Sequence, residues 1–298
     1  MVSDEVLVAD GSGTALERII EMKYLISLLV FLIGGCSTVN SSSTSDTTSL
    51  TQTVDSASID IIVKNNAGPT ILYIPGCNGL DKSGRQYQQY HLKKFQEVWP
   101  NANIVISQYV NDYTKGEANG KCDWTDDNTR LVGRQISNQA EHTQKLGDWI
   151  KTQPWSNGDV HLFGFSFGGA IGLWAPAHNR STVTGKPKLF KTVALIWPDC
   201  RPVLRQFFGN IHTPLRIWST ENDPLSVPKN CPSFYTDTDK KLILTLYPGN
   251  THSWMTSPYF QPFTKYWPNQ KITVQHEFKE EWANETFKEW QSWALQQN

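Results

Sequence analysis

The stretch Asp159–Ala177, which reads DVHLFGFSFGGAIGLWAPA, decides the fold. It begins with an apolar run at 160–165, continues through Ser166, and then reaches small residues that open a second apolar segment. This order predicts a strand, a sharp turn and a helix. Gly164, Ser166 and Gly168 form the Gly-x-Ser-x-Gly pattern of a nucleophile elbow, whose small residues keep the strand and the helix from colliding. A glycine-rich turn without chemistry is the alternative interpretation.

Short apolar segments alternate with helical patterns from Ser58 onward. We expect strands at 58–64, 70–76, 103–110, 160–166, 191–197, 214–220 and 242–249. We expect helices at 84–99, 135–153, 168–175 and 279–298. Strands rich in β-branched residues and separated by helices favour an α/β fold, with a mainly parallel sheet covered by helices on both faces. The chemistry of such sheets belongs to the loops at the carboxyl ends of the strands.

A serine hydroxyl needs a base within hydrogen-bonding distance, and the base needs an acid that orients it. In α/β-hydrolases both groups follow the serine along the chain. Among the histidines after Ser166, His178 ends a predicted helix, His212 precedes a strand, and His276 precedes the last helix. His252 instead follows a strong strand through a Pro-Gly-Asn turn, and we predict it as the base. A surface or capping histidine is the alternative.

The acid should follow the preceding strand, where the segment 214–228 offers Glu221 and Asp223. We choose Asp223, because its neighbours fit a loop that returns across the edge of the sheet. The Asn-Asp-Pro sequence around it is also typical of a simple turn.

An acyl-transfer site also needs two backbone amides that stabilise the oxyanion. The first amide should be that of Phe167, directly after the serine. For the second we predict the amide of Cys77, with Asn78 as the fallback, in the small-residue turn 75–79; a plain tight turn is the alternative. The sequence shows no tight cluster of histidines and acidic residues, so we expect no metal and no cofactor.

Several motifs between Thr70 and the C-terminus resemble the dienelactone hydrolase family within the α/β-hydrolases. They are PGCNGL at 75–80, CDW at 122–124, AEHTQKLGDWIKTQPW at 140–155, HLFGFSFGGAIGL at 161–173, ENDPLSVPKNC at 221–231 and LYPGNTH at 246–252. The resemblance implies an α/β-hydrolase fold with Ser166 as nucleophile, Asp223 as acid and His252 as base. The chain has Pro75 where the family more often has histidine, and a serine where the family's best-known members have a cysteine nucleophile. The substrate therefore stays open.

These features favour a serine hydrolase that cleaves small-molecule carboxylic esters through an acyl-enzyme. A peptidase or amidase on the same fold is one alternative. Another is a surface lipoprotein without catalysis that grips glycans with some of its 12 tryptophans. The 27 basic and 28 acidic residues nearly balance, so no global field favours nucleic acid. The sequence leaves the oligomeric state open.

The N-terminal region predicts a targeting signal at 1–36. A lysine and a short apolar run at 24–33 have the length of a signal-peptide core, which is too short to span a bilayer as a helix. The residues Ile33-Gly34-Gly35-Cys36 resemble the bacterial lipobox, which implies lipidation of Cys36 and attachment to the membrane of the bacterial cell envelope. Acidic residues precede the core, so we expect translation to begin at Met22. An uncleaved anchor or a buried helix is the alternative.

The segment 37–57 is rich in serine and threonine and poor in large apolar residues, so we expect a flexible tether there. The catalytic domain should then span 58–298, which is long enough to bury one sizeable core.

Four cysteines remain after Cys36, and an even number in an oxidising compartment makes two disulfides plausible. We prefer the pairs Cys77 with Cys122 and Cys200 with Cys231, because the second pair brackets one predicted strand. Four buried thiols are the alternative.

Overall fold

A central sheet of eight strands organises the part of the chain that the structure, a computed structural model, describes. The described residues are 47–54, 57–64, 67–76, 82–107, 129–176, 189–201, 211, 213–234, 242–256, 258–259, 261–267 and 271–297. All of them fall within one compact unit, Ser41–Asn298.

The sheet has the strand order β1-β2-β4-β3-β5-β6-β7-β8. Its strands are β1 (Thr47–Val54), β2 (Ala57–Lys64), β3 (Gly68–Ile74), β4 (Asn103–Ser107), β5 (Ser156–Phe165), β6 (Thr192–Ile196), β7 (Leu215–Thr220) and β8 (Ile243–Tyr247). The six strands from β4 to β8 run parallel, whereas β1 and β2 are antiparallel to their neighbours. The mainly parallel sheet predicted from the sequence is thus confirmed.

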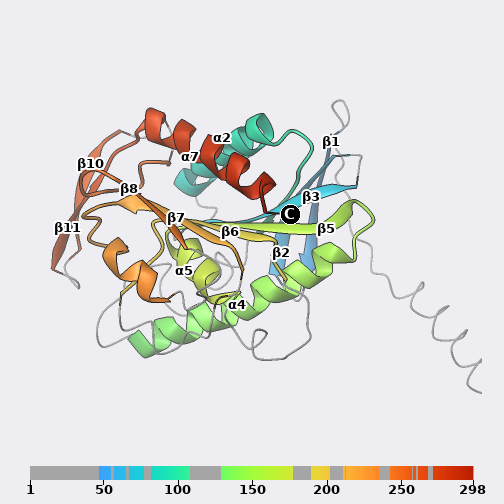
Figure 1. Ribbon diagram of the computed structural model, residues 1–298, viewed down its shortest axis with the longest axis horizontal. Coiled ribbons are helices and arrows are strands. Elements are labelled where there is room, and N and C mark those ends of the chain that lie inside the picture. Colours follow the sequence, from blue (N-terminus) through green and yellow to red (C-terminus); the bar gives the residue numbers. More distant parts are fainter. Residues whose placement is uncertain are drawn as a thin grey trace, which may run out of the picture. The chain divides into compact units, whose positions relative to one another are not determined.

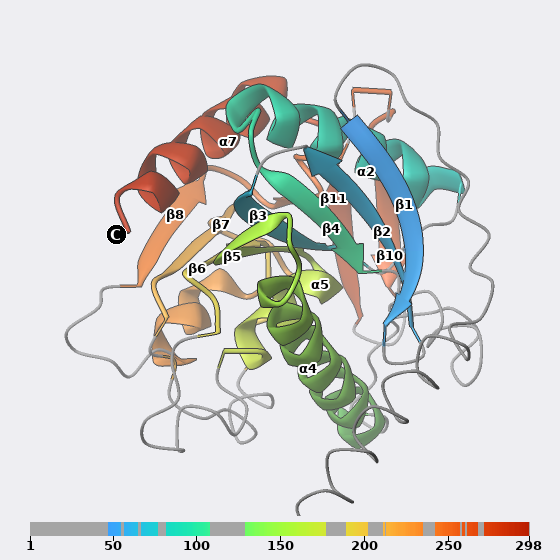
Figure 2. The ribbon, with the colours of Figure 1, turned by 90° about the vertical axis from the view of Figure 1, so that its right-hand side faces the viewer.

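Helices cover both faces of this sheet (Figure 1; Figure 2). On one face lie α4 (Thr129–Lys151) and α5 (Phe167–Trp174), and on the other lie α2 (Lys82–Val98) and α7 (Glu280–Leu295). Successive side chains of a strand point to opposite faces, so each strand contributes to two cores. The neighbours Leu162 and Phe163 illustrate this: the first packs in the α4–α5 core and the second in the α2–α7 core. Burial on both faces explains why the central strands read as continuous apolar runs.

A second, three-stranded sheet has the order β10-β11-β9 and was not expected from the sequence. It consists of β9 (Thr251–His252), β10 (Phe263–Trp267) and β11 (Ile272–His276). β9 pairs in parallel with β11, and His252 lies opposite His276. A strand of two residues is too short to show periodicity, and four of the five residues of β10 are exposed, so neither carried a pattern that could be recognised.

The strand β1 lies in the segment 37–57, where we expected only a flexible tether, and it precedes the domain boundary expected at Ser58. It pairs with β2 along its full length, from Thr47 opposite Lys64 to Val54 opposite Ala57. Threonine is β-branched and favours strands, and an edge strand needs little apolar surface because backbone hydrogen bonds hold it. The composition of the segment therefore concealed a strand.

Among the described residues, no helix combines the length and the apolar character needed to cross a membrane. The expected targeting region 1–36, with Met22 and Cys36, lies outside the described residues, so its assignment stays a prediction.

Candidate active site

Ser166 lies at the tip of the turn between β5 and α5, in an unusual backbone conformation. Its φ is 50° and its ψ is −111°, a region that residues with a side chain rarely adopt. Its amide donates to the carbonyl of Ile196 on the neighbouring strand at 2.9 Å, and its own carbonyl accepts from the amide of Ala170 at 2.9 Å. These two bonds fix the turn from both sides. The conformation and its place between strand and helix are those of a nucleophile elbow.

The two glycines that flank Ser166 are required by close backbone contacts. A Cβ on Gly164 would lie 2.5 Å from the carbonyl oxygen of Gly168. A Cβ on Gly168 would overlap the carbonyl groups of Ile74 and Pro75 at the end of β3. The motif therefore has a steric cause. β5, α5 and the end of β3 lie so close together that neither glycine position has room for a side chain.

The structure brings Ser166, Asp223 and His252 together. Nδ1 of His252 lies 2.7 Å from Oδ2 of Asp223, and Nε2 lies 3.1 Å from Oγ of Ser166. A carboxylate only accepts, so Nδ1 carries the proton and donates to Asp223. Nε2 then has a free lone pair and accepts from the hydroxyl of Ser166. The three residues come from the turn after β5, the loop after β7 and β9, all at the carboxyl ends of the parallel strands.

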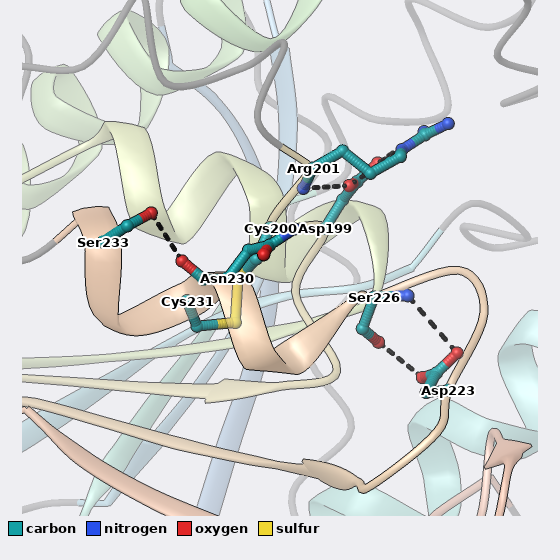
Figure 3. Close-up of a disulfide and its surroundings, with 8 residues drawn as sticks. All are labelled: Asp199, Cys200, Arg201, Asp223, Ser226, Asn230, Cys231 and Ser233. Carbon is teal, nitrogen blue, oxygen red and sulfur yellow. Dashed lines mark hydrogen bonds and ion pairs between the residues drawn. A yellow bond between two sulfur atoms is a disulfide. The ribbon is translucent and has the colours of Figure 1, made fainter.

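The carboxylate of Asp223 is fully buried and held by its own loop. Oδ1 accepts from the amide of Ser226 at 3.3 Å, and Oδ2 accepts from the hydroxyl of Ser226 (Figure 3). Oδ1 also accepts from the amide of Leu225 at 2.9 Å, and Oδ2 accepts from His252. Sequence reasoning did not identify Ser226. The Asp-Pro-x-Ser spacing was a usable signal, because an aspartate often bonds to the amides two and three residues later in a turn.

Glu221, the other acid considered from the sequence, is exposed, and its amide donates to the carbonyl of Tyr247 at 2.9 Å. The side chain that reaches His252 is that of Asp223.

The ring of His252 is supported by Trp197 and by the small sheet. The ring centroids of Trp197 and His252 are 5.2 Å apart, and His276 lies opposite His252 in the register of β11 and β9. Nδ1 of His276 hydrogen-bonds to Oγ of Ser253 at 2.9 Å. Burial lowers the pKa of His276 to about 3, and the neighbouring His252 adds to this effect, so His276 is uncharged at neutral pH. A neutral His276 ring would not repel a protonated His252.

Of the two residues whose amides we expect to stabilise the oxyanion, the structure describes Phe167 and not Cys77. Phe167 begins α5 directly after Ser166, so its amide lies at the N-terminus of the helix. The end of β3 lies against the serine, because a Cβ built on Gly76 would be 3.4 Å from Cβ of Ser166. Cys77 and Asn78, the next residues, lie outside the described part of the chain.

A disulfide joins Cys200, after β6, to Cys231, in the 3₁₀ helix η2 (Pro228–Phe234) that follows the loop of Asp223 (Figure 3). Both cysteines are buried, and the amide of Cys200 also donates to the carbonyl of Ser226 at 2.8 Å. This is one of the two pairs expected from the sequence. The other, Cys77 with Cys122, lies outside the described residues.

No group of three or more histidine, cysteine, aspartate or glutamate side chains within the described ranges is arranged to hold a metal ion.

The parallel sheet, the helices on both faces and the serine turn after β5 together define an α/β-hydrolase fold. Solved structures share it. An α/β-hydrolase enzyme from a Medee basin deep-sea metagenome library aligns with a TM-score of 0.52 and 13% identity, over 85% of this chain and 99% of that one. An esterase/lipase from an uncultured bacterium aligns with a TM-score of 0.52 and 12% identity, over 98% of this chain and 94% of that one.

A dienelactone hydrolase from Anabaena variabilis aligns with a TM-score of 0.49 and 13% identity, over 72% of this chain and 89% of that one. No family model matches the sequence, and no curated protein matches it. Identities this low establish the fold alone. Membership of the dienelactone hydrolase family stays a prediction.

Proposed function

We propose that the protein is a serine hydrolase that cleaves small carboxylic esters, with Ser166 as nucleophile, His252 as base and Asp223 as acid. The observation that carries this proposal is the pair of hydrogen bonds on one imidazole, at 2.7 Å to Asp223 and 3.1 Å to Ser166. The strained serine turn is a second support, because backbone strain of this kind clusters at active sites.

In the first half of the reaction, His252 takes the hydroxyl proton of Ser166 through Nε2 while Oγ attacks the ester carbonyl. Asp223 holds the imidazole in the required tautomer and stabilises its protonated form. Collapse of the tetrahedral intermediate transfers the proton from Nε2 to the departing alcohol and leaves an acyl group on Ser166. The amide of Phe167 at the N-terminus of α5 and, by our assignment, that of Cys77 stabilise the oxyanion.

In the second half, water enters the place of the alcohol and gives a proton to Nε2 of His252. Its oxygen attacks the acyl carbon, and the second tetrahedral intermediate collapses with Ser166 as the leaving group. The proton returns from Nε2 to Oγ of Ser166, so the free carboxylic acid departs and the enzyme regains its starting state.

Labelling with a fluorophosphonate probe tests this proposal. The wild-type protein should react covalently, and Ser166→Ala should not. Ser253→Ala is the matched control, because Ser253 also hydrogen-bonds to a histidine, His276, yet within the described residues no carboxylate is hydrogen-bonded to that histidine. The control should keep the label. A wild-type protein that stays unlabelled would support a binding protein without catalysis.

The same triad also serves amide hydrolysis, so the ester assignment needs its own measurement. We expect turnover of p-nitrophenyl esters with short acyl chains and at least about a hundredfold lower kcat/KM for the corresponding anilides, because the amine leaves less readily. Equal or faster cleavage of anilides and peptides would identify a peptidase or amidase instead.

We further propose that the protein is anchored to the bacterial cell envelope through a lipid on Cys36. The support is the short apolar run at 24–33, followed by the lipobox-like sequence that ends at this cysteine. Mass spectrometry of the native protein should find the N-terminus at a lipid-modified Cys36, and Cys36→Ser should move the protein out of the membrane fraction. An intact peptide across Gly35-Cys36 would contradict this.

A further inference from the structure

We propose that His91 is a positioning residue of this site: one buried imidazole on α2 that ties the segment carrying the base to the strand carrying the nucleophile. The inference rests on the proposed function, because it concerns how the triad is held. It assigns a role to a histidine that lies 75 positions before Ser166 and that the reaction itself does not use.

The first link runs from His91 to the segment that follows the base. Nε2 of His91 lies 2.6 Å from the carbonyl oxygen of Met255, three residues after His252. A carbonyl only accepts, so Nε2 carries the proton and donates it. Nδ1 is then an acceptor and accepts a hydrogen bond from the hydroxyl of Tyr73 at 2.9 Å. Tyr73 lies on β3, two residues before the turn in which the second oxyanion amide is expected.

The second link runs through stacked rings. The ring of His91 lies flat on Phe165, with centroids 4.0 Å apart and planes 10° apart, and Phe165 is the residue before Ser166. Phe165 contacts Trp197 edge-on at 5.7 Å, and Trp197 in turn packs against His252 at 5.2 Å. His91 therefore reaches the base by two routes, one through a backbone hydrogen bond and one through packed aromatic rings.

The charge state of His91 suits this role. Its ring is buried, and burial lowers its pKa to about 4, so the imidazole is neutral at physiological pH. A neutral ring has one donor and one acceptor, and the carbonyl of Met255 determines which nitrogen is which. Both hydrogen bonds are satisfied in one tautomer, so the ring has a single preferred orientation.

His161 is a matched comparison for His91, because we assign it a structural role only. It too is buried, its pKa is also lowered to about 4, and its Nδ1 lies 2.8 Å from the hydroxyl of Thr192. It lies on β5 five residues before Ser166, and its ring packs on Trp99. Neither Thr192 nor Trp99 is next to a triad residue in the sequence. Loss of His161 should therefore lower stability without disturbing the site.

The test compares His91→Phe, His91→Gln and His161→Phe in the full-length protein, with p-nitrophenyl butyrate as substrate. Phenylalanine keeps the stacking surface but removes both hydrogen bonds, so His91→Phe should lower kcat about tenfold or more while KM changes less than about threefold. Glutamine restores a donor toward Met255, so His91→Gln should recover most of the lost kcat. His161→Phe should keep kcat within about twofold of wild type.

A spectroscopic measurement makes the test independent of turnover. The proton on Nδ1 of His252, hydrogen-bonded to Asp223, should give a downfield proton resonance in wild type and in His161→Phe. It should broaden or disappear in folded His91→Phe. If wild type shows neither labelling nor turnover, the proposed function fails, and this resonance still decides whether His91 positions His252.

Tyr73→Phe is the second variant, should His91→Phe fail to fold. It removes only the hydroxyl that donates to Nδ1 of His91, and it should lower kcat about threefold with little change in KM. A folded His91→Phe with wild-type kcat and an unchanged resonance would overturn the proposal. So would an equal loss of kcat in His161→Phe or, should His91→Phe fail to fold, an unchanged kcat in Tyr73→Phe.

Discussion

Among the single residues, Asp223 illustrates how hydrogen bonds stabilise a buried charge. A carboxylate taken out of water needs partners for its lone pairs, and this one has two amides, a hydroxyl and an imidazole proton. The two amides and the hydroxyl all belong to Leu225 and Ser226 in its own loop. Asp223 therefore keeps its position whether or not His252 is protonated, which allows it to steady the imidazole through the whole proposed reaction.

Replacement of Asp223 by asparagine should lower kcat by about 10³ to 10⁴, because an amide nitrogen facing Nδ1 favours the wrong tautomer of His252. Glu221→Gln is the matched control, since this exposed side chain is two residues away, and it should keep kcat within about twofold. Steady-state kinetics on p-nitrophenyl butyrate measure both. If the two variants lose similar activity, the acid is wrongly assigned.

The sequence predicted those residues whose motif is explained by contacts between neighbours in the chain. Gly164, Ser166 and Gly168 are adjacent in the chain, and the collision that excludes a side chain from both glycines explains the motif directly. Trp197 and His91 carried no such signal, because their roles depend on contacts with residues far along the chain. Only the folded arrangement identifies them.

At the scale of elements, the loop after β7 is fastened on two sides. The amide of Cys200 donates to the carbonyl of Ser226, and the disulfide joins Cys200 to Cys231 beyond the loop, so the segment that follows β6 and the loop of Asp223 are held together. The covalent link spans 31 positions of sequence, a stretch that contains β7 and the acid.

The double substitution Cys200→Ala with Cys231→Ala should lower the free energy of unfolding by about 3–4 kcal/mol, because a cross-link over such a loop restricts the unfolded chain. Urea unfolding of wild type and of the double variant measures the difference. Reductant should have little effect on the folded wild-type protein, since both sulfur atoms are buried. Equal stabilities would show that the link adds nothing to the fold.

Two of the strands that sequence reasoning missed, β1 and β9, carry no regular pattern of apolar residues. The central strands and the long helices bury a regular set of apolar residues, and their order and type were predicted. β9 is held by its pairing with β11, and β1 by its pairing with β2, so backbone hydrogen bonds rather than a regular pattern of apolar side chains define them. The pattern of apolar residues in the sequence therefore does not predict such strands.

At the scale of the whole molecule, three buried histidines make the fold sensitive to acid. Burial lowers the pKa of His91 and His161 to about 4 and that of His276 to about 3, each from 6.5. Above pH 6.5 these groups are neutral in both states, and their contribution to stability is fully present. As the pH falls from 6.5 toward 4, these histidines bind protons in the unfolded chain but stay neutral in the folded chain, so the free energy of unfolding decreases.

The free energy of unfolding should therefore fall between pH 6.5 and pH 5, with a slope that approaches about 1.4 kcal/mol per pH unit for each histidine. Urea titrations at several pH values measure this slope. His161→Phe should reduce this slope by the contribution of one histidine. A free energy that stays level across this range would contradict the assignment of buried, neutral rings.

The spacing of the site along the chain has a consequence for synthesis. Ser166 and His252 are 86 positions apart, and His91 and Met255 are 164 positions apart. Ser166 is thus translated well before His252, the residue that by our proposal activates it. α7, which follows His252 in the sequence, packs in the same core as Phe165 and Trp197. Under the proposed function, the serine of a nascent chain therefore stays without its base until His252 has been translated.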